Sequence, residues 1–171
     1  MIRPFRAEDQ TAVQEVIKSV CDDYGFTWDP DDYHADLWDI ENTYVHRGGF
    51  WVAEHEGKVV GTIGLTLFPT VPGTIGEVVE VEGTKRIGGA DCEFCRLYVI
   101  KEARGLKLGR RLAETIIEAA QRRGCCAMEI WSDKLFVEAH ALYAKLGAKI
   151  VGERICDDPD EAPEWGMVLP L

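Results

Sequence analysis

The sequence contains no run of about eighteen apolar residues, so no segment is long enough to cross a membrane as a helix. The first residues, 1–6, also lack the apolar core of a secretory signal peptide, which predicts a cytoplasmic protein. Without such a signal, we expect the six cysteines to be reduced thiols rather than a disulfide framework.

Arrangements of residues that bind metals or form covalent intermediates are missing as well. The four histidines have no metal-ligand spacing. Cys92 and Cys95 form a C-x-x-C, but they lie in an apolar run that reads as a strand, where this spacing puts the two side chains on opposite faces. We therefore expect no metal site. No Ser-His-Asp or Cys-His arrangement for a nucleophile is visible either.

Positive charge is scarce, with 19 lysines and arginines against 30 acidic residues and a net charge of −11. This excess argues against nonspecific binding to nucleic acid or to anionic membranes, because both need a cationic surface. Two interpretations stay open: the acidity favours a cationic acceptor, or it keeps the protein soluble.

The length of 171 residues and the 46% apolar content suit one domain with a sizeable core. No internal repeat, low-complexity tract or long linker divides the chain, which predicts a single domain over residues 1–171.

Apolar periodicity predicts strands and helices in an alternating order. We expect an edge strand at the N-terminus, helices over 8–24, 108–123 and 134–146, and a weaker helical segment near 33–42. The expected strands are 50–54, 59–68, 92–99, 125–131, 149–156 and 164–169, and the Gly-rich insertion 70–91 holds an extra hairpin around 79–82. This order indicates an α+β or mixed α/β sheet covered by helices.

The most informative segment runs from Val99 to Leu112, where the strand ends in a basic turn with Gly105 and Gly109 that opens directly into a helix. The first N–H groups of a helix lack partners and lie at its positive end, so they can bind a phosphate. The P-loop pattern and the G-x-G-x-x-G pattern are both absent. Coenzyme A is a pyrophosphate ligand that suits this turn; a solvated basic turn is the alternative.

Residues 104–109, Arg-Gly-Leu-Lys-Leu-Gly, resemble the Arg/Gln-x-x-Gly-x-Gly/Ala coenzyme A motif of the GNAT N-acetyltransferase superfamily. Residues 141–148 resemble the second signature of that family, a helix with a tyrosine that ends just before a glycine. Residues 2–9 and 50–61 resemble its first three strands. The resemblance implies a mostly antiparallel, twisted sheet of about seven strands with helices on both faces. It also implies that two central strands splay at the cofactor site.

The implied activity is direct transfer of an acetyl group from acetyl-CoA to a primary amine of a small molecule or peptide. The implied cofactor contacts are Leu97, Tyr98, Val99, Arg104, Gly105, Leu106, Lys107, Leu108, Gly109, Arg110 and Phe136. Two of them depart from the family pattern. Lys107 replaces the usual first glycine, which matters if that position needs a positive φ. Phe136 replaces an asparagine that contacts the pantetheine arm, and Ser132 or Asp133 is a substitute.

Two side chains are the implied catalytic groups. Glu93 matches a position where some members carry the general base. The alternatives are that it pairs with Arg96, and that bulk water or another carboxylate such as Glu129 takes the proton. Tyr143 matches the tyrosine that protonates the leaving thiolate; the alternative is a packing role. The family's oxyanion donor is a backbone N–H, here within residues 97–99.

Other assignments stay open at this stage. The second functional class is a non-catalytic acyl-CoA-binding sensor or interaction domain, and transfer of a longer acyl group is also compatible with the sequence. Trp28 and Trp38 lie where the family builds its acceptor pocket, whereas we expect His140 to be a satisfied structural histidine. The acceptor's identity is undetermined, and both a monomer and a homodimer are open.

Overall fold

The computed structural model describes residues 1–171, which divide into two compact units. The first unit comprises Met1–Thr66 and Cys95–Ala119, and the second comprises Leu67–Phe94 and Ala120–Leu171. The single domain expected over residues 1–171 stays a prediction.

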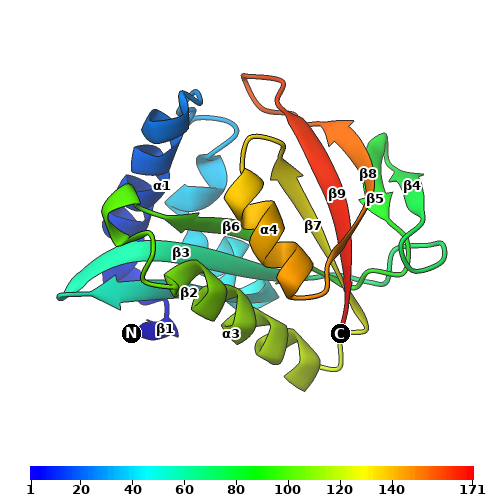
Figure 1. Ribbon diagram of the computed structural model, residues 1–171, viewed down its shortest axis with the longest axis horizontal. Coiled ribbons are helices and arrows are strands. Elements are labelled where there is room, and N and C mark those ends of the chain that lie inside the picture. The colour runs from blue at the N-terminus through cyan, green and yellow to red at the C-terminus, as the bar shows by residue number, and fades with distance from the viewer. The chain divides into compact units, whose positions relative to one another are not determined.

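The first unit begins with an antiparallel set of strands, β1 (Ile2–Pro4), β2 (Gly48–His55) and β3 (Lys58–Leu67). Helix α1 (Gln10–Tyr24) ends at Gly25, which adopts a left-handed φ of 76°. Short helical turns follow at Ala35–Trp38, at α2 (Ile40–Thr43) and at Val45–Arg47 (Figure 1). The weak helix expected near 33–42 is therefore broken into separate turns.

The core of the first unit joins α1 to β2 and to the segment between them. Val13 and Ile17 of α1 are fully buried, and they share a cluster with Leu37, Phe50 and Val52. Helix α3 (Leu108–Arg122) has a buried apolar stripe at four-residue steps, formed by Leu108, Leu112, Ile116 and Ala120.

The second unit contains β7 (Ala127–Asp133), β8 (Lys149–Ile155) and β9 (Pro163–Pro170), with β9 between the other two and antiparallel to both. Strand β6 (Cys92–Val99) pairs in parallel with β7 through Cys92↔Met128 and Glu93↔Glu129. The insertion forms the expected hairpin, β4 (Val78–Val81) and β5 (Thr84–Ile87).

The strand order β1-β2-β3-β6-β7-β9-β8 gives a seven-stranded, mostly antiparallel sheet, and β4-β5 is a separate two-stranded sheet. This topology confirms the expected mixed α+β class. No helix of the chain combines the length and the apolar character that a membrane crossing needs. The cytoplasmic location stays a prediction.

The last helix departs from its expected limits. Helix α4 covers Val137–Lys145 rather than 134–146, because Asp133 ends β7 and its carboxylate accepts the N–H of Leu135 at 2.6 Å. Asp133 therefore caps the preceding turn instead of the helix. Leu135, which lies before the helix, is 59% exposed, whereas Tyr143 is the buried side chain of α4.

Candidate active site

The expected cofactor loop has the backbone shape of an anion-binding turn. After β6 and a 3-10 turn at Lys101–Ala103, Gly105 and Lys107 both adopt left-handed conformations, with φ of 85° and 58°. Helix α3 begins at Leu108, and Arg111 N–H donates to Lys107 O at 3.1 Å. The preceding N–H groups of this first turn therefore lie at the open, positive end of the helix.

Lys107 is thus the departure from the family pattern that matters. A non-glycine residue in the left-handed region has a conformational cost of about 1 kcal/mol, and glycine would adopt this φ without it. Lys107 is exposed, so its side chain is accommodated outside the turn.

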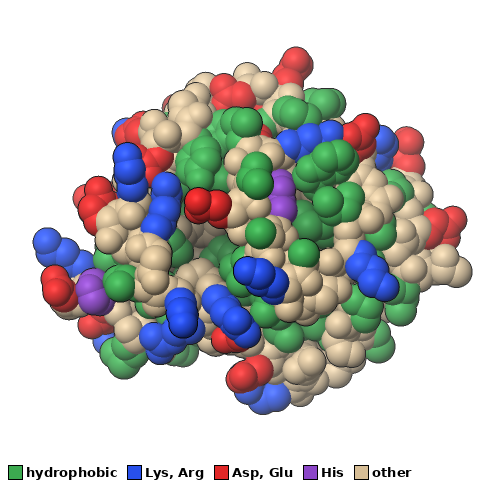
Figure 2. Space-filling view, viewed as in Figure 1, with side chains coloured by type: hydrophobic (Ala, Val, Ile, Leu, Met, Phe, Trp, Pro, Cys, Tyr) green, Lys and Arg blue, Asp and Glu red, His purple; other side chains and the backbone are tan.

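Three arginines follow the end of β6, and the structure gives two of them local partners. Arg104 donates to Asp23 at 2.9 Å and to Val99 O at 3.2 Å. Arg110 pairs with Glu114 at 2.7 Å, one turn along α3, and Arg111 is exposed. Lys and Arg side chains gather over the region where α3 is drawn (Figure 2). The overall negative charge therefore includes a local basic surface at the cofactor loop.

A left-handed residue interrupts β6 between Glu93 and the expected oxyanion donors. Arg96 has a φ of 55°, and its carbonyl accepts the hydroxyl of Thr62 at 2.8 Å. Leu97, Tyr98 and Val99 follow and are half-buried, and burial raises the pKa of Tyr98 to about 12. This interruption has the character of a bulge, a feature that redirects the backbone next to active sites.

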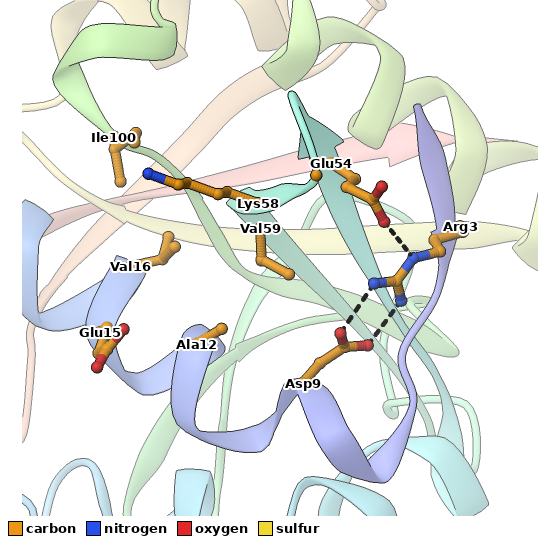
Figure 3. A pocket seen from close by; sticks show the side chains of 10 residues that line it. Arg3, Asp9, Ala12, Glu15, Val16, Glu54, Lys58, Val59 and Ile100 are labelled. Atoms are coloured by element: carbon orange, nitrogen blue, oxygen red, sulfur yellow. Dashed lines mark hydrogen bonds and ion pairs between the residues drawn. The ribbon is translucent and has the colours of Figure 1, made fainter.

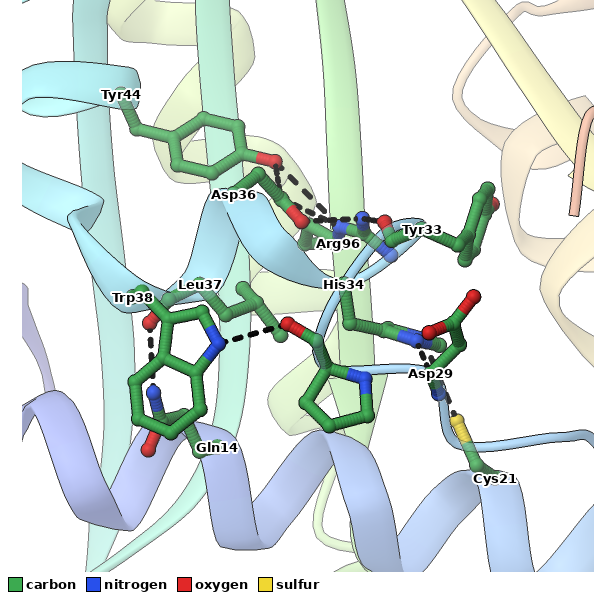
Figure 4. Close-up of polar contacts among 11 residues, drawn as sticks. Gln14, Cys21, Asp29, Tyr33, His34, Asp36, Leu37, Trp38, Tyr44 and Arg96 are labelled. Atoms are coloured by element: carbon green, nitrogen blue, oxygen red, sulfur yellow. Dashed lines mark hydrogen bonds and ion pairs between the residues drawn. The ribbon is translucent and has the colours of Figure 1, made fainter.

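The alternative that Glu93 pairs with Arg96 is wrong. Arg96 instead makes two hydrogen bonds to Asp36, at 2.7 and 3.0 Å, and donates to Tyr33 O at 3.0 Å (Figure 4). Tyr44 OH also donates to Asp36. The pair is largely buried, with side-chain exposures of 11% for Arg96 and 20% for Asp36. Arg96 therefore anchors the segment that follows α1.

That segment contains both tryptophans expected in the acceptor region. Trp28 stacks on His34 with ring centroids 4.5 Å apart. Trp38 is 61% exposed, and its indole N–H donates to Pro30 O (Figure 4). His34 is buried, and its Nδ1 accepts the N–H of Asp29 at 3.2 Å. Burial lowers the pKa of His34, with the positive charge of Arg96 as the second cause. His34 is therefore neutral and structural.

Glu93, the expected base, is a half-buried carboxylate of the second unit with no hydrogen bond or ion pair in the structure. Burial raises its pKa from 4.5 to about 7, and the negative charge of Glu129 is the second cause. A carboxylate with such a pKa is a competent proton acceptor near neutral pH.

Both carboxylate oxygens of Glu129, the alternative base, already accept hydrogen bonds. Glu129 is fully buried, and its two oxygens accept from Arg86 Nε at 2.5 Å and from Ile87 N–H at 2.8 Å. On the neighbouring strands, Arg154 pairs with Glu164 at 2.8 Å. Of the four acidic and basic side chains around Glu93, each has a partner, so Glu93 is the available carboxylate.

Tyr143, the expected acid, is 4% exposed and belongs to the second unit with Glu93. Its ring packs edge-on against Phe94, the residue after Glu93, with centroids 4.9 Å apart and an interplanar angle of 71°. The ring therefore has a packing role. Whether the hydroxyl is also an acid stays a prediction.

The expected substitutes for the missing asparagine are engaged within the protein. Ser132 Oγ lies 3.1 Å from His140 Nε2, and the Asp133 carboxylate accepts the Leu135 N–H. His140 is accordingly a satisfied histidine whose pKa is lowered by burial. Phe136 is half-buried in the turn that leads into α4, and its N–H donates to Asp133 O at 3.1 Å.

A surface pocket of about 480 Å³ lies elsewhere in the first unit, among β1, α1 and the β2–β3 turn (Figure 3). Arg3 points between Asp9 and Glu54 and binds both, at 2.7 and 2.9 Å. The arginine charge is therefore neutralised, and none of the expected catalytic or loop residues lines this pocket.

A third polar group joins Asp91, Cys92 and Cys125, whose possible ligand atoms lie within 4.8 Å of one another. The Asp91 carboxylate accepts the N–H groups of Cys126 and Ala127, which fixes the start of β7. Burial raises the pKa of the Cys92 and Cys125 thiols, so both are protonated. We assign these side chains a structural role.

The structure thus brings Glu93 and Tyr143 into one unit and assigns the cofactor loop to the other. Sequence reasoning missed Arg86, Arg154 and Asp36. Arg86 and Arg154 pair with the two glutamates near Glu93, and Asp36 pairs with Arg96. The alternating hairpin of the insertion was a signal for Arg86. No local pattern marked the other two, because their partners are supplied by distant strands.

Comparison with known proteins agrees with this fold and these motifs. The model of the acetyltransferase (GNAT) family matches residues 13–148. The chain therefore belongs to the acetyltransferase (GNAT) family. The family match, together with relatives named N-acetyltransferases, supports the class of N-acetyltransferase.

Among curated relatives, an Escherichia coli K12 protein named an uncharacterized N-acetyltransferase, YjgM, is 29% identical over 150 residues, 86% of this chain and 80% of that protein. The Xenopus tropicalis protein named probable N-acetyltransferase camello is 33% identical over 118 residues, 67% of this chain. The alignment spans 45% of camello, so the chain matches about half of that relative.

Among solved structures, a GNAT-family acetyltransferase of Staphylococcus aureus Mu50 has a TM-score of 0.78 and 21% identity, with 100% of this chain and 98% of that chain covered. The Salmonella typhimurium protein yncA, solved with its cofactor acetyl-CoA, has a TM-score of 0.68 and 19% identity, with 100% and 93% covered. These likenesses establish the fold.

Proposed function

We propose that this protein transfers the acetyl group of acetyl-CoA directly to a primary amine of a small molecule or peptide. The observation that carries the proposal is Glu93, a carboxylate without a partner whose pKa is raised by burial to about 7. An alkylammonium has a pKa of about 10.4 and cannot attack a thioester until it loses a proton. A carboxylate of this kind is suited to accept that proton.

The cofactor loop supports acetyl-CoA as the co-substrate. Gly105 and Lys107 turn the backbone so that α3 starts at Leu108, and the open N–H groups of its first turn suit a pyrophosphate. Arg110 and Arg111 are exposed in the same turn and add positive charge. The family and the acetyl-CoA bound in yncA point to the same ligand.

The transfer then needs three groups of this chain. Glu93 takes a proton from the ammonium, and the neutral amine forms a C–N bond to the thioester carbon. A backbone N–H within residues 97–99, after the interruption at Arg96, stabilises the oxyanion. The C–S bond then breaks, and Tyr143 donates a proton to the departing thiolate. No covalent enzyme intermediate is required.

A panel of amines with acetyl-CoA tests this function, with release of the coenzyme A thiol and product mass as the readouts. We expect amine-dependent thiol release and an acceptor that gains the mass of one acetyl group. Because Glu93 must be deprotonated, kcat/KM should fall as the pH drops below about 7.

A non-catalytic acyl-CoA sensor is the second candidate, favoured by the burial of Tyr143, which suits packing. It predicts tight acetyl-CoA binding by calorimetry with no amine-dependent thiol release from any amine of the panel. Propionyl-CoA and longer acyl donors in the same assay measure the acyl length that the site accepts.

A further inference from the structure

The insertion hairpin β4-β5 is fixed to the sheet of the second unit at several points. Gly152 of β8 leaves room for Val78 of β4, because a Cβ at Gly152 would lie 2.5 Å from Val78 Cγ2. Lys85 Nζ donates to Glu153 O at 3.0 Å, and Ile87 is fully buried with core residues of β7 and β9. The hairpin is therefore a docked part of this unit.

The hairpin provides the hydrogen-bond donors for one carboxylate, that of Glu129. Arg86 and the N–H of Ile87 bind the two oxygens of Glu129, and the Arg86 guanidinium lies 4.5 Å from the ring centroid of Phe68. Glu129 has no exposed surface, so an ionised side chain at this position depends on these two donors.

Glu129 is the register partner of Glu93 on the neighbouring parallel strand, which places both carboxylates on the same face. The charged groups that act on Glu93 are Glu129 on β7, Arg86 on β5, Arg154 on β8 and Glu164 on β9. Two adjacent carboxylates without a cation share a proton, because like charges at close range cannot both stay ionised.

We propose that Arg86 is a positioning residue for acetyl transfer: together with the N–H of Ile87 it occupies both oxygens of Glu129, so that the proton taken from the acceptor amine resides on Glu93. This inference rests on the proposed function, in which Glu93 is the base. In the step itself, the ammonium N–H bond breaks, its electron pair stays on nitrogen, and the proton forms an O–H bond on Glu93. Without Arg86, the carboxylate pair binds its first proton at a higher pH, so less of the base is free when the amine arrives.

The test is a titration of the glutamate side-chain carboxyls by ¹³C NMR in the wild-type chain, Arg86→Gln and Glu129→Gln. Arg86→Gln removes the cation that binds Glu129 and leaves Arg154 in place, so we expect the first protonation of the Glu93–Glu129 pair to move to higher pH by about one unit. Glu129→Gln removes the like charge, so we expect the protonation of Glu93 to move to lower pH. These opposite displacements are the signature of the proposal.

Lys85→Gln is the matched control, because it removes a neighbouring cation of the same strand that binds only a backbone carbonyl of β8. It should leave the titration unchanged. Arg86→Lys, which keeps the charge, should return the midpoint most of the way to the wild-type value. If Glu129→Gln does not fold, the Arg86→Gln and Arg86→Lys pair decides the outcome.

A lowered melting temperature in Arg86→Gln with an unchanged titration would overturn the proposal and leave Arg86 a purely structural residue. The pH dependence of kcat/KM separates this result from failure of the proposed function. If both are correct, the acid limb moves with the NMR midpoint. If no amine supports thiol release, the proposed function fails, and the titration alone still measures the coupling of Arg86 to the pair.

Discussion

Two partly buried charged side chains of this protein, Arg96 and Glu93, have opposite surroundings. In the first unit, Arg96 makes four side-chain hydrogen bonds and one ring contact that link Asp36, Tyr33 and Tyr44 into one cluster. In the second unit, Glu93 has no hydrogen-bond partner, although Glu129 beside it has two donors.

The presence or absence of partners distinguishes a charged group with a structural role from one that is available for proton transfer. A buried charge with a full set of partners is held in one state and positions the backbone around it. A partly buried carboxylate without a partner binds a proton more readily than it does in water, and the ionised form lowers the stability of the fold. Arg96 and Glu93 are three residues apart on β6, so a single strand contains both the partnered and the unpartnered charge.

The largest effect is expected for Glu93→Gln, which keeps the shape of the side chain and removes its basicity. Turnover should fall by about 10²–10⁴-fold, and the acid limb of kcat/KM with its midpoint near pH 7 should disappear. Thiol release measured across pH 5.5–9 checks both effects. Glu80→Gln, an exposed carboxamide control on β4, should behave like the wild type. A retained acid limb would exclude Glu93 as the base.

Glu93→Gln should also change how the free energy of unfolding depends on pH. The pKa of Glu93 is higher in the folded state than its ordinary value of 4.5, so the folded state binds more protons than the unfolded state between pH 4.5 and about 7. Wild-type stability therefore decreases as the pH rises through that window. Glu93→Gln should lack this decrease and be the more stable protein at pH 8 in urea unfolding.

Asp36→Asn removes the charged partner of Arg96, so the largely buried guanidinium loses its counter-charge. We expect a loss of about 3 kcal/mol in the free energy of unfolding, measured by denaturant titration. Asp31→Asn removes an exposed carboxylate from the same segment and should change stability by less than about 0.5 kcal/mol. Equal stabilities for the two variants would show that the Arg96 cluster does not hold this segment.

Tyr143→Phe keeps the ring that packs against Phe94 and deletes only the hydroxyl. Turnover should fall by about 10- to 1000-fold under conditions where chemistry limits the rate, while acetyl-CoA affinity stays close to the wild-type value. An unchanged rate for Tyr143→Phe would leave this residue a packing role alone.

Gly109→Asp places a carboxylate in the first turn of α3. A negative charge there favours the helix dipole but repels a pyrophosphate, so helix stability and cofactor affinity should respond in opposite directions. Calorimetry should show acetyl-CoA affinity reduced at least about tenfold, which is about 1.4 kcal/mol. Gly57→Asp in the β2–β3 turn adds the same charge away from this helix and should bind normally.

The smallest effect concerns the strained loop residue. Lys107→Gly should raise the free energy of unfolding by about 0.5–1 kcal/mol, since glycine adopts the φ of 58° without the cost of a Cβ. Lys107→Ala removes the same charge but keeps the Cβ, so it should not gain this stability. Thermal unfolding of both variants measures the difference.

The local features of the chain were predictable from its residues. The four-residue apolar steps of α3, the turn glycines, and the alternating hairpin residues of the insertion each act within a few positions, where periodicity and φ preference operate. The predicted start of the last helix at residue 134 was wrong, because Asp133 ends a strand instead of capping a helix. Neither capping nor periodicity distinguishes these two uses of an aspartate.

The sequence alone therefore determined the fold class, the basic loop before α3, and the family resemblance of Glu93 and Tyr143, because motif order and backbone preference are local properties. Tertiary structure decided which charges meet. Arg96 and Asp36 are separated by 60 residues, and Arg86 and Glu129 by 43. Pairing over such distances depends on strand order and register, and it is this pairing that left Glu93 without a partner.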